Sequence, residues 1–153
     1  MTYCVDTSAL LDGWSRWYPP EIFPSLWQKL AGLIAAGQLV APEDVLLELK
    51  KKEDDLTKWA KKQRGLFQPL DVPTQEALRD VMAAFERLVN TQKDRSTADP
   101  LVIALAKARD LVVVTGEKAS GNPNRPKIPD VCDHFRIRCI NLTALIRENR
   151  WTF

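Results

Sequence analysis

The sequence contains few of the residues on which several large classes of site depend. It has one histidine, His134, and three cysteines among 153 residues. A single histidine excludes a ribonuclease that uses a histidine pair as general acid and base. The cysteines have neither CxxC nor Cys/His zinc spacing, and so sparse and odd a set does not make a disulfide framework. We therefore expect reduced thiols and a cytoplasmic protein.

Long apolar runs and glycine-rich nucleotide loops are missing as well. The longest apolar stretches are far too short to span a bilayer, and Met1 leads directly into a strand-like run instead of a signal peptide, so we expect no membrane association. Glycine-rich dinucleotide fingerprints are absent. The segment 116–121 has the glycine spacing of a phosphate loop, but Asn122 and Pro123 stand where that loop needs Lys and Ser or Thr.

The residues that are present predict one α/β domain over 1–153. Hydrophobic residues make up 45% of the chain and charged residues 27%, which suits a folded protein with a real core. Short β-prone runs alternate with amphipathic segments, so we expect a three-layer Rossmann-like fold with a mostly parallel sheet between helices. The expected strands are 3–5, 38–41, 111–114 and 137–140. The expected helices are 7–13, 22–34, 42–49, 77–89, 99–108 and 142–148.

Two further segments have a distinctive composition. Residues 50–62 are mostly charged, and we expect them to form a solvated extension of the preceding helix, a wet face with a smaller chance of binding RNA or a partner. Residues 116–129 are rich in Gly, Asn, Pro and basic side chains, which predicts a loop. Its basic residues are candidates for holding RNA phosphates, with a merely solvated loop as the equal alternative. They are Lys118, Arg125 and Lys127.

Four acidic residues are candidates for a metal site. In open parallel sheets, active sites form beyond the carboxyl ends of the strands. Asp6 directly follows the first expected strand, Glu117 follows the strand at 111–114, and Asp99 begins the buried helix. Glu48 borders the apolar stripe of the third helix. Carboxylates that converge repel one another, and Mg²⁺ or Mn²⁺ relieves this repulsion because hard cations prefer oxygen ligands.

Each candidate also has a purely structural explanation. Asp6 and Asp99 are good helix N-caps, the latter followed by Pro100. Glu48 is suitably spaced to pair with Lys52 on a wet helical face. A loop residue such as Glu117 is most often simply solvated. Only their convergence at one site would favour metal chemistry.

Four segments of the sequence resemble the motifs of a known family, the PIN-domain ribonucleases. Residues 3–11 resemble the family's opening, in which an apolar strand ends in Asp and a small hydroxyl residue follows. Residues 45–49 resemble its second acidic motif, a Glu-Leu pair on a helix. Residues 98–106 are similar to the third, an Asp that opens an Ala-rich helix. Residues 112–117 resemble the fourth, a strand followed by Thr, one residue and an acid.

The resemblance implies a Mg²⁺- or Mn²⁺-dependent endoribonuclease. Asp6, Glu48, Asp99 and Glu117 would be its catalytic and metal-binding residues, and Thr7, Ser8 and Thr115 would support the carboxylates by hydrogen bonds. Many bacterial and archaeal members are VapC-like toxins, so we expect RNA as substrate, a possible antitoxin protein as partner, and a homodimer. The second hypothesis is a catalytically inactive PIN-like module that binds RNA or protein.

The sequence departs from the family pattern around the fourth acid. Glu117 stands where Asp is usual, and Ala119 stands where many members have a further Asp. Because the loop that follows is long, Asp130 is an alternative fourth acid. Outside the four motifs, Trp14 and Trp17 lie in a Pro-flanked segment and are candidates for a partner-binding patch, with base stacking as the other reading.

Overall fold

The structure is a computed structural model of the chain and describes residues 1–85, 98–122 and 124–153, except for the side chains of Ala98 and Asp99. Within these residues, parallel strands form one sheet in the order β3-β2-β1-β4-β5. The strands are β1 (Tyr3–Val5), β2 (Leu39–Pro42), β3 (Phe67–Gln68), β4 (Val112–Val114) and β5 (Cys139–Ile140). The predicted α/β fold with a parallel sheet is confirmed.

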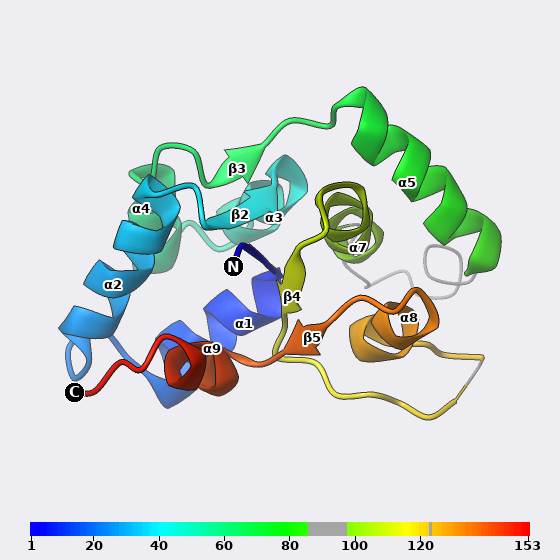
Figure 1. Cartoon of the computed structure of the whole chain (residues 1–153). Helices are drawn as coiled ribbons and strands as arrows, with labels where there is room; N and C mark the ends of the chain where they lie inside the picture. The colour runs from blue at the N-terminus through cyan, green and yellow to red at the C-terminus, as the bar shows by residue number, and fades with distance from the viewer. Residues whose placement is uncertain (86–97, 123) are drawn as a thin grey trace.

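Helices cover both faces of the sheet, which makes the fold a three-layer Rossmann-like one. Figure 1 shows α1, α2 and α9 on one side of the strands and α5, α7 and α8 on the other. The helices are α1 (Thr7–Asp12), the π-helix η1 (Gly13–Trp17), α2 (Pro24–Ala35), α3 (Glu43–Lys50), α4 (Asp55–Lys61), α5 (Val72–Ala84), α7 (Ala98–Arg109), α8 (Ile128–His134) and α9 (Leu142–Glu148). Among the described residues, no helix is long and apolar enough to cross a membrane.

The central strands and α7 form the core because they are apolar on every side. All three residues of β1 and of β4 are buried, as expected of parallel strands with helices on both faces. The middle of α7, residues 102–106, is buried along its whole length. A helix that is apolar all round is stable only inside a protein, so α7 packs against β1, β2 and β4.

Helix α2 ends where the glycine signal predicted an end. Gly37 adopts a φ of 73°, a left-handed conformation that favours glycine. Its N–H donates to the carbonyl of Ile34 at 3.0 Å, and the N–H of Gln38 donates to that of Leu33 at 2.8 Å. These two bonds make a Schellman motif, which satisfies carbonyls at the helix end. The helix begins at Pro24, two residues later than predicted.

Two expectations about the middle of the chain are wrong. The charged segment 50–62 is not a solvated extension of α3. The chain turns at Glu53, whose φ is 45°, and a separate helix, α4, begins after Asp54, which caps it by accepting from the N–H of Thr57. Helix α4 buries Leu56 completely. Phe67–Gln68, where no strand was expected, forms the edge strand β3 beside β2.

Candidate active site at the carboxyl ends of β1 and β4

Asp6 and Thr115 lie side by side where the order of strands reverses. The chain moves outward from β1 to β2 and β3, then crosses to the other side of β1 for β4 and β5. β1 pairs with β4 in the register Val5↔Val114, so the next residue of each strand reaches the same edge. The crevice at such a switch point is the usual ligand site of open α/β sheets.

Hydroxyl groups of Ser8 in α1 and of Thr115 after β4 hold the Asp6 carboxylate. Oδ1 accepts from the N–H of Ser8 at 2.8 Å, which caps α1, and Oδ2 accepts from Ser8 Oγ at 2.7 Å. The hydroxyl of Thr115 also donates to Oδ2. Both readings of Asp6 are therefore compatible, because the residue caps a helix and still lies at the switch point.

Two backbone N–H groups of the loop after β4 extend this network. The N–H of Gly116 donates to Ser8 Oγ at 2.9 Å, and the N–H of Glu117 donates to Thr115 Oγ1 at 3.0 Å. Each hydroxyl therefore accepts from the loop and donates to Asp6, which locks the loop onto the start of α1. The expected support by Ser8 and Thr115 is confirmed. Thr7 does not take part: its buried hydroxyl has no hydrogen-bond partner among the described groups.

The charge on Asp6 is unfavourable in this environment. Burial raises its pKa from 3.8 to about 6, even though the hydrogen bonds from Thr115 and Ser8 act in the opposite direction. The neighbouring carboxylate of Glu117 raises the pKa further by like-charge repulsion. Among the described side chains, no Lys or Arg forms a salt bridge with Asp6. A carboxylate of this kind is a good position for a cation.

Glu117 and Asp130, the two candidates for the fourth acid, have different environments. Glu117 is half-buried, its Oε2 accepts from the N–H of Ile128 at 3.0 Å, and its charge acts on Asp6. Asp130 instead organises the loop. Its Oδ2 accepts from the N–H of Lys127 at 2.7 Å and from that of Ser120 at 2.9 Å. Burial raises the pKa of Asp130, but the backbone hydrogen bonds outweigh it and hold the pKa below its usual value.

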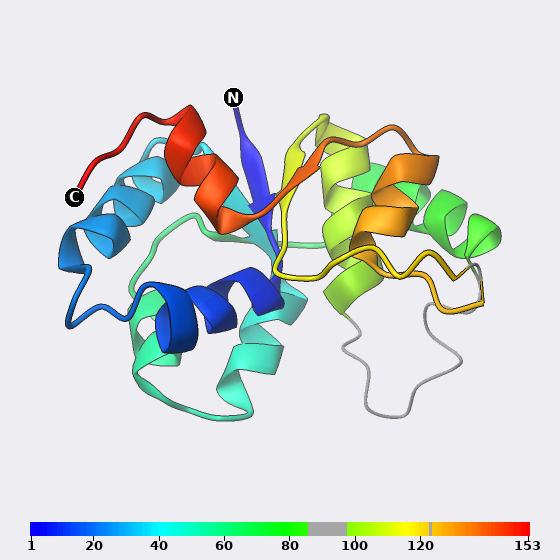
Figure 2. The same ribbon diagram turned by 90° about the horizontal axis from the view of Figure 1, so that it is seen from below.

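The other two predicted acids lie on helices that reach this edge of the sheet. Glu48 is half-buried on α3, which contacts both α1 and α7. Asp99 stands in the first turn of α7, and its side chain lies outside the described part of the structure. Figure 2 shows that α7 begins on the same side of the molecule on which β1 and β4 end. This follows from the chain path, because α7 runs back antiparallel to the strands before β4 begins.

The described carboxylate oxygens are the type of ligand atom that a hard divalent cation binds. Oδ1 of Asp6 accepts only one hydrogen bond from the described groups, and a carboxylate oxygen can accept two. Carboxylate oxygens are the ligands that Mg²⁺ and Mn²⁺ prefer. The described side chains contain no cluster of three or more His, Cys, Asp or Glu able to hold an ion. The structure therefore does not bring Asp6, Glu48 and Glu117 together as a three-residue cluster, and Asp99, at the start of α7, is the remaining predicted acid.

Sequence reasoning missed Asp12 and Gly116 beside this site. A Cβ atom on Gly116 would lie 2.5 Å from Asp12 Oδ2 and 3.2 Å from the carbonyl oxygen of Ser8. Glycine at this position therefore lets the loop after β4 pass close against α1. The available signal was Gly116 itself, which directly follows a strand that ends at the predicted site.

Together these features define an α/β protein with a buried carboxylate, a second acid beside it and supporting hydroxyls at the switch point of a parallel sheet. The chain belongs to the DUF4411 family, described as a domain of unknown function, whose family model matches residues 3–153. No curated protein and no solved structure matches the chain.

Proposed function

We propose that this protein is a metal-dependent endoribonuclease of the PIN type that hydrolyses RNA phosphodiester bonds. The observation that carries the proposal is the Asp6 carboxylate, which is 2% exposed and lies beside Glu117. Burying a charge without a counter-charge is destabilising. If only a helix cap were needed, Ser or Thr would provide it without burying a charge. A divalent cation would remove this cost and make use of the charge.

In this proposal, Asp6, Glu48, Asp99 and Glu117 hold one or more Mg²⁺ or Mn²⁺ ions. Such an ion would supply Lewis-acid chemistry, lowering the pKa of a bound water molecule and stabilising the charge that develops on the phosphodiester oxygens. Glu48 helps to bind the ion or orients the attacking water. Ser8 and Thr115 fix the direction of the Asp6 carboxylate through their hydroxyl hydrogen bonds to Oδ2, and Oδ1 accepts one hydrogen bond from the described groups.

The likeness to PIN domains supports this choice of substrate and reaction. Four segments resemble the family's motifs in the same order, and the first and fourth of these segments contain β1 and β4, which are neighbouring strands. By the same likeness we propose a cytoplasmic, toxin-like protein that is paired with an antitoxin and forms a homodimer. A small neighbouring reading frame that encodes a DNA-binding protein would support the toxin role.

The test is cleavage of single-stranded RNA by the purified protein with Mg²⁺ or Mn²⁺ and with EDTA. We expect cleavage that requires the metal and is lost in Asp6→Asn, because Asn still caps α1 but removes the charge. Cleavage that persists in EDTA, or in a folded Asp6→Asn protein, would contradict the proposal. RNA binding without cleavage in any divalent metal would favour the inactive binding module instead.

A further inference from the structure

A pocket of about 530 Å³ lies beside the carboxylate site. It is bounded by α1 and η1 on one side, and by the loop after β4 and the start of α9 on the other. Thr115 and Gly116 form part of its wall, and both take part in the hydrogen-bond network around Asp6. A ligand in this pocket would therefore lie next to the proposed catalytic carboxylates. Its volume is in the usual range for small-ligand sites.

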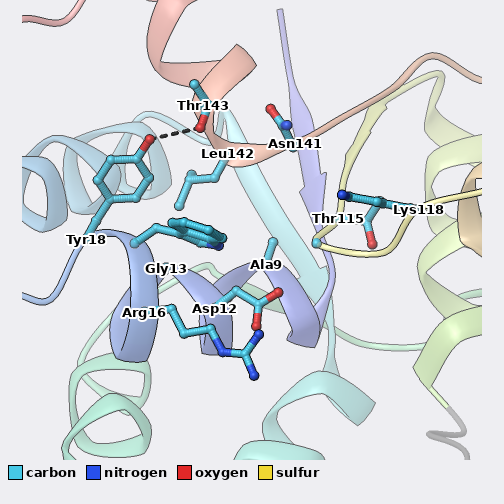
Figure 3. Close-up of a pocket in the computed structure, with 12 residues that line it drawn as sticks. Ala9, Asp12, Gly13, Arg16, Tyr18, Thr115, Lys118, Asn141, Leu142 and Thr143 are labelled. Carbon is cyan, nitrogen blue, oxygen red and sulfur yellow. Dashed lines mark hydrogen bonds between the residues drawn. The ribbon is translucent and has the colours of Figure 1, made fainter.

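The pocket wall combines apolar and polar groups and carries two cationic side chains. Arg16 comes from η1 and Lys118 from the loop after β4, so the two reach it from separate segments (Figure 3). At the far wall, the hydroxyls of Tyr18 and Thr143 lie 2.8 Å apart and hydrogen-bond. One acid, Asp12, also lines the pocket. This wall composition suits an anionic ligand that carries further polar groups.

The π-helix turns Trp17 outward toward this pocket. In η1 the N–H of Tyr18 donates to the carbonyl of Gly13, an i→i+5 bond that widens the helix. Trp14 packs inward, with its ring centroid 4.7 Å from that of Trp27. Trp17, three residues later, lines the pocket and is 66% exposed. Short π-helical segments are rare and often occur at functional sites.

We propose that this pocket binds one nucleotide of a single-stranded RNA next to the scissile bond. Trp17 stacks on the base, because every base has a π-face that an exposed indole can cover. Arg16 and Lys118 hold the phosphate that follows, as basic side chains do in most nucleic-acid contacts. The inference rests on the proposed nuclease function, because that function supplies RNA as the substrate.

Asp12 gives the proposal a distinctive consequence. Its carboxylate lies close to Gly116 and lines the pocket, so it repels a phosphate held by Lys118. Asp12→Asn should therefore bind RNA more tightly than the parent. A surface that bound RNA elsewhere would not respond in this way.

The experiment measures binding of a short fluorescein-labelled single-stranded RNA in EDTA by fluorescence anisotropy, so that no cleavage occurs. We expect Trp17→Ala to weaken binding roughly 5- to 100-fold and Trp17→Phe to restore most of the affinity. Lys118→Gln should lower the salt slope of the affinity by about 1. Two controls should bind as the parent does. Phe153→Ala removes an aromatic that is 55% exposed, and Lys58→Gln removes a cation on α4.

Failure of this inference and failure of the nuclease proposal are distinguishable. If Trp17→Ala and Lys118→Gln bind RNA as the parent does, or if the parent does not bind RNA, the pocket assignment is overturned whether or not the protein cleaves RNA with Mn²⁺. If the variants lose affinity as expected and the parent cleaves nothing in any metal, the pocket assignment holds and the nuclease proposal fails. Thermal melts confirm that each variant is folded.

Discussion

The hydroxyl of Thr115 donates a hydrogen bond to Oδ2 of Asp6, although 109 positions separate the two residues in the sequence. The bond joins the carboxyl ends of β1 and β4 at the point where the strand order reverses. It aligns the buried carboxylate, and through the N–H of Glu117 it also anchors the second acid. The carboxylate site is thus built from two strand ends that hold each other in register.

The stability of the metal-free protein should depend on pH through Asp6. Its pKa is about 6 in the folded protein, against 3.8 ordinarily, so the folded state binds this proton more tightly than the unfolded state. The contribution is fully present below about pH 4 and is lost as the pH rises through 6. The shift corresponds to roughly 3 kcal/mol. Urea unfolding in EDTA between pH 4 and pH 7 measures it.

Asp6→Asn is the matched control for this pH dependence, because the variant keeps a cap and cannot ionise. The free energy of unfolding of the parent should fall relative to that of the variant across the range. Parallel profiles for the two proteins would show that Asp6 ionises normally.

Glu117→Gln and Asp130→Asn should separate metal binding from loop structure. Gln keeps an oxygen that accepts from the N–H of Ile128, so the first variant should fold normally, yet Mn²⁺ should raise its melting temperature less than that of the parent. Asp130→Asn weakens the bonds to Ser120 and Lys127 and should lose about 1–2 kcal/mol. Its response to Mn²⁺ should remain. The reverse pattern would make Asp130 the fourth acid.

Asp99→Asn should abolish RNA cleavage without unfolding the protein. The structure begins α7 at Ala98, so Asp99 lies inside the first turn and is not the N-cap that the sequence predicted. Asn has nearly the same size and shape as Asp, so the start of α7 should persist, while one negative charge is removed from the proposed cluster. The helix dipole favours a charge at this end by about 0.3–1 kcal/mol, so a small loss of stability is expected. Cleavage at saturating Mn²⁺ and a melting curve are the two measurements. A folded variant that cleaves RNA as fast as the parent would show that Asp99 has no part in catalysis.

Gly116→Ala should destabilise the protein by about 1–3 kcal/mol and reduce cleavage. The added methyl group would press on Asp12 and on the backbone of Ser8, and would push the loop after β4 away from α1. Gly32→Ala is the control. Apart from its chain neighbours and the backbone of α2 itself, no atom of the described residues lies within 4 Å of its Cβ position, and replacing a helical glycine should stabilise by about 0.5–1 kcal/mol. If the two substitutions change the free energy of unfolding equally in chemical denaturation, an added methyl group at Gly116 causes no strain.

The sequence by itself determined the elements that can be recognised from their own residues, whatever segments pack against them. The valines of β4 and the apolar middle of α7 are local patterns that suit only the interior. Helix ends were also readable, because Gly37 and Asp6 satisfy backbone groups only a few residues away. Since Asp6 directly follows β1 and Glu117 is the third residue after β4, their place at one edge of a parallel sheet could be predicted.

Only the tertiary structure decided the features that depend on distant partners. The edge strand β3 has two residues and no pattern of its own, and it exists because β2 offers free backbone groups. The charged segment after α3 folds back as α4 because Leu56 has a core to enter. Asp130 and Glu117 are both acids at the ends of one loop, and the sequence does not distinguish them. The path of the loop directs Asp130 to the backbone N–H groups of that loop and brings Glu117 close to Asp6. Likewise, the tryptophan spacing does not reveal that η1 packs Trp14 against the core and leaves Trp17 at a pocket, because a π-helix has no local signal comparable to a cap or a glycine.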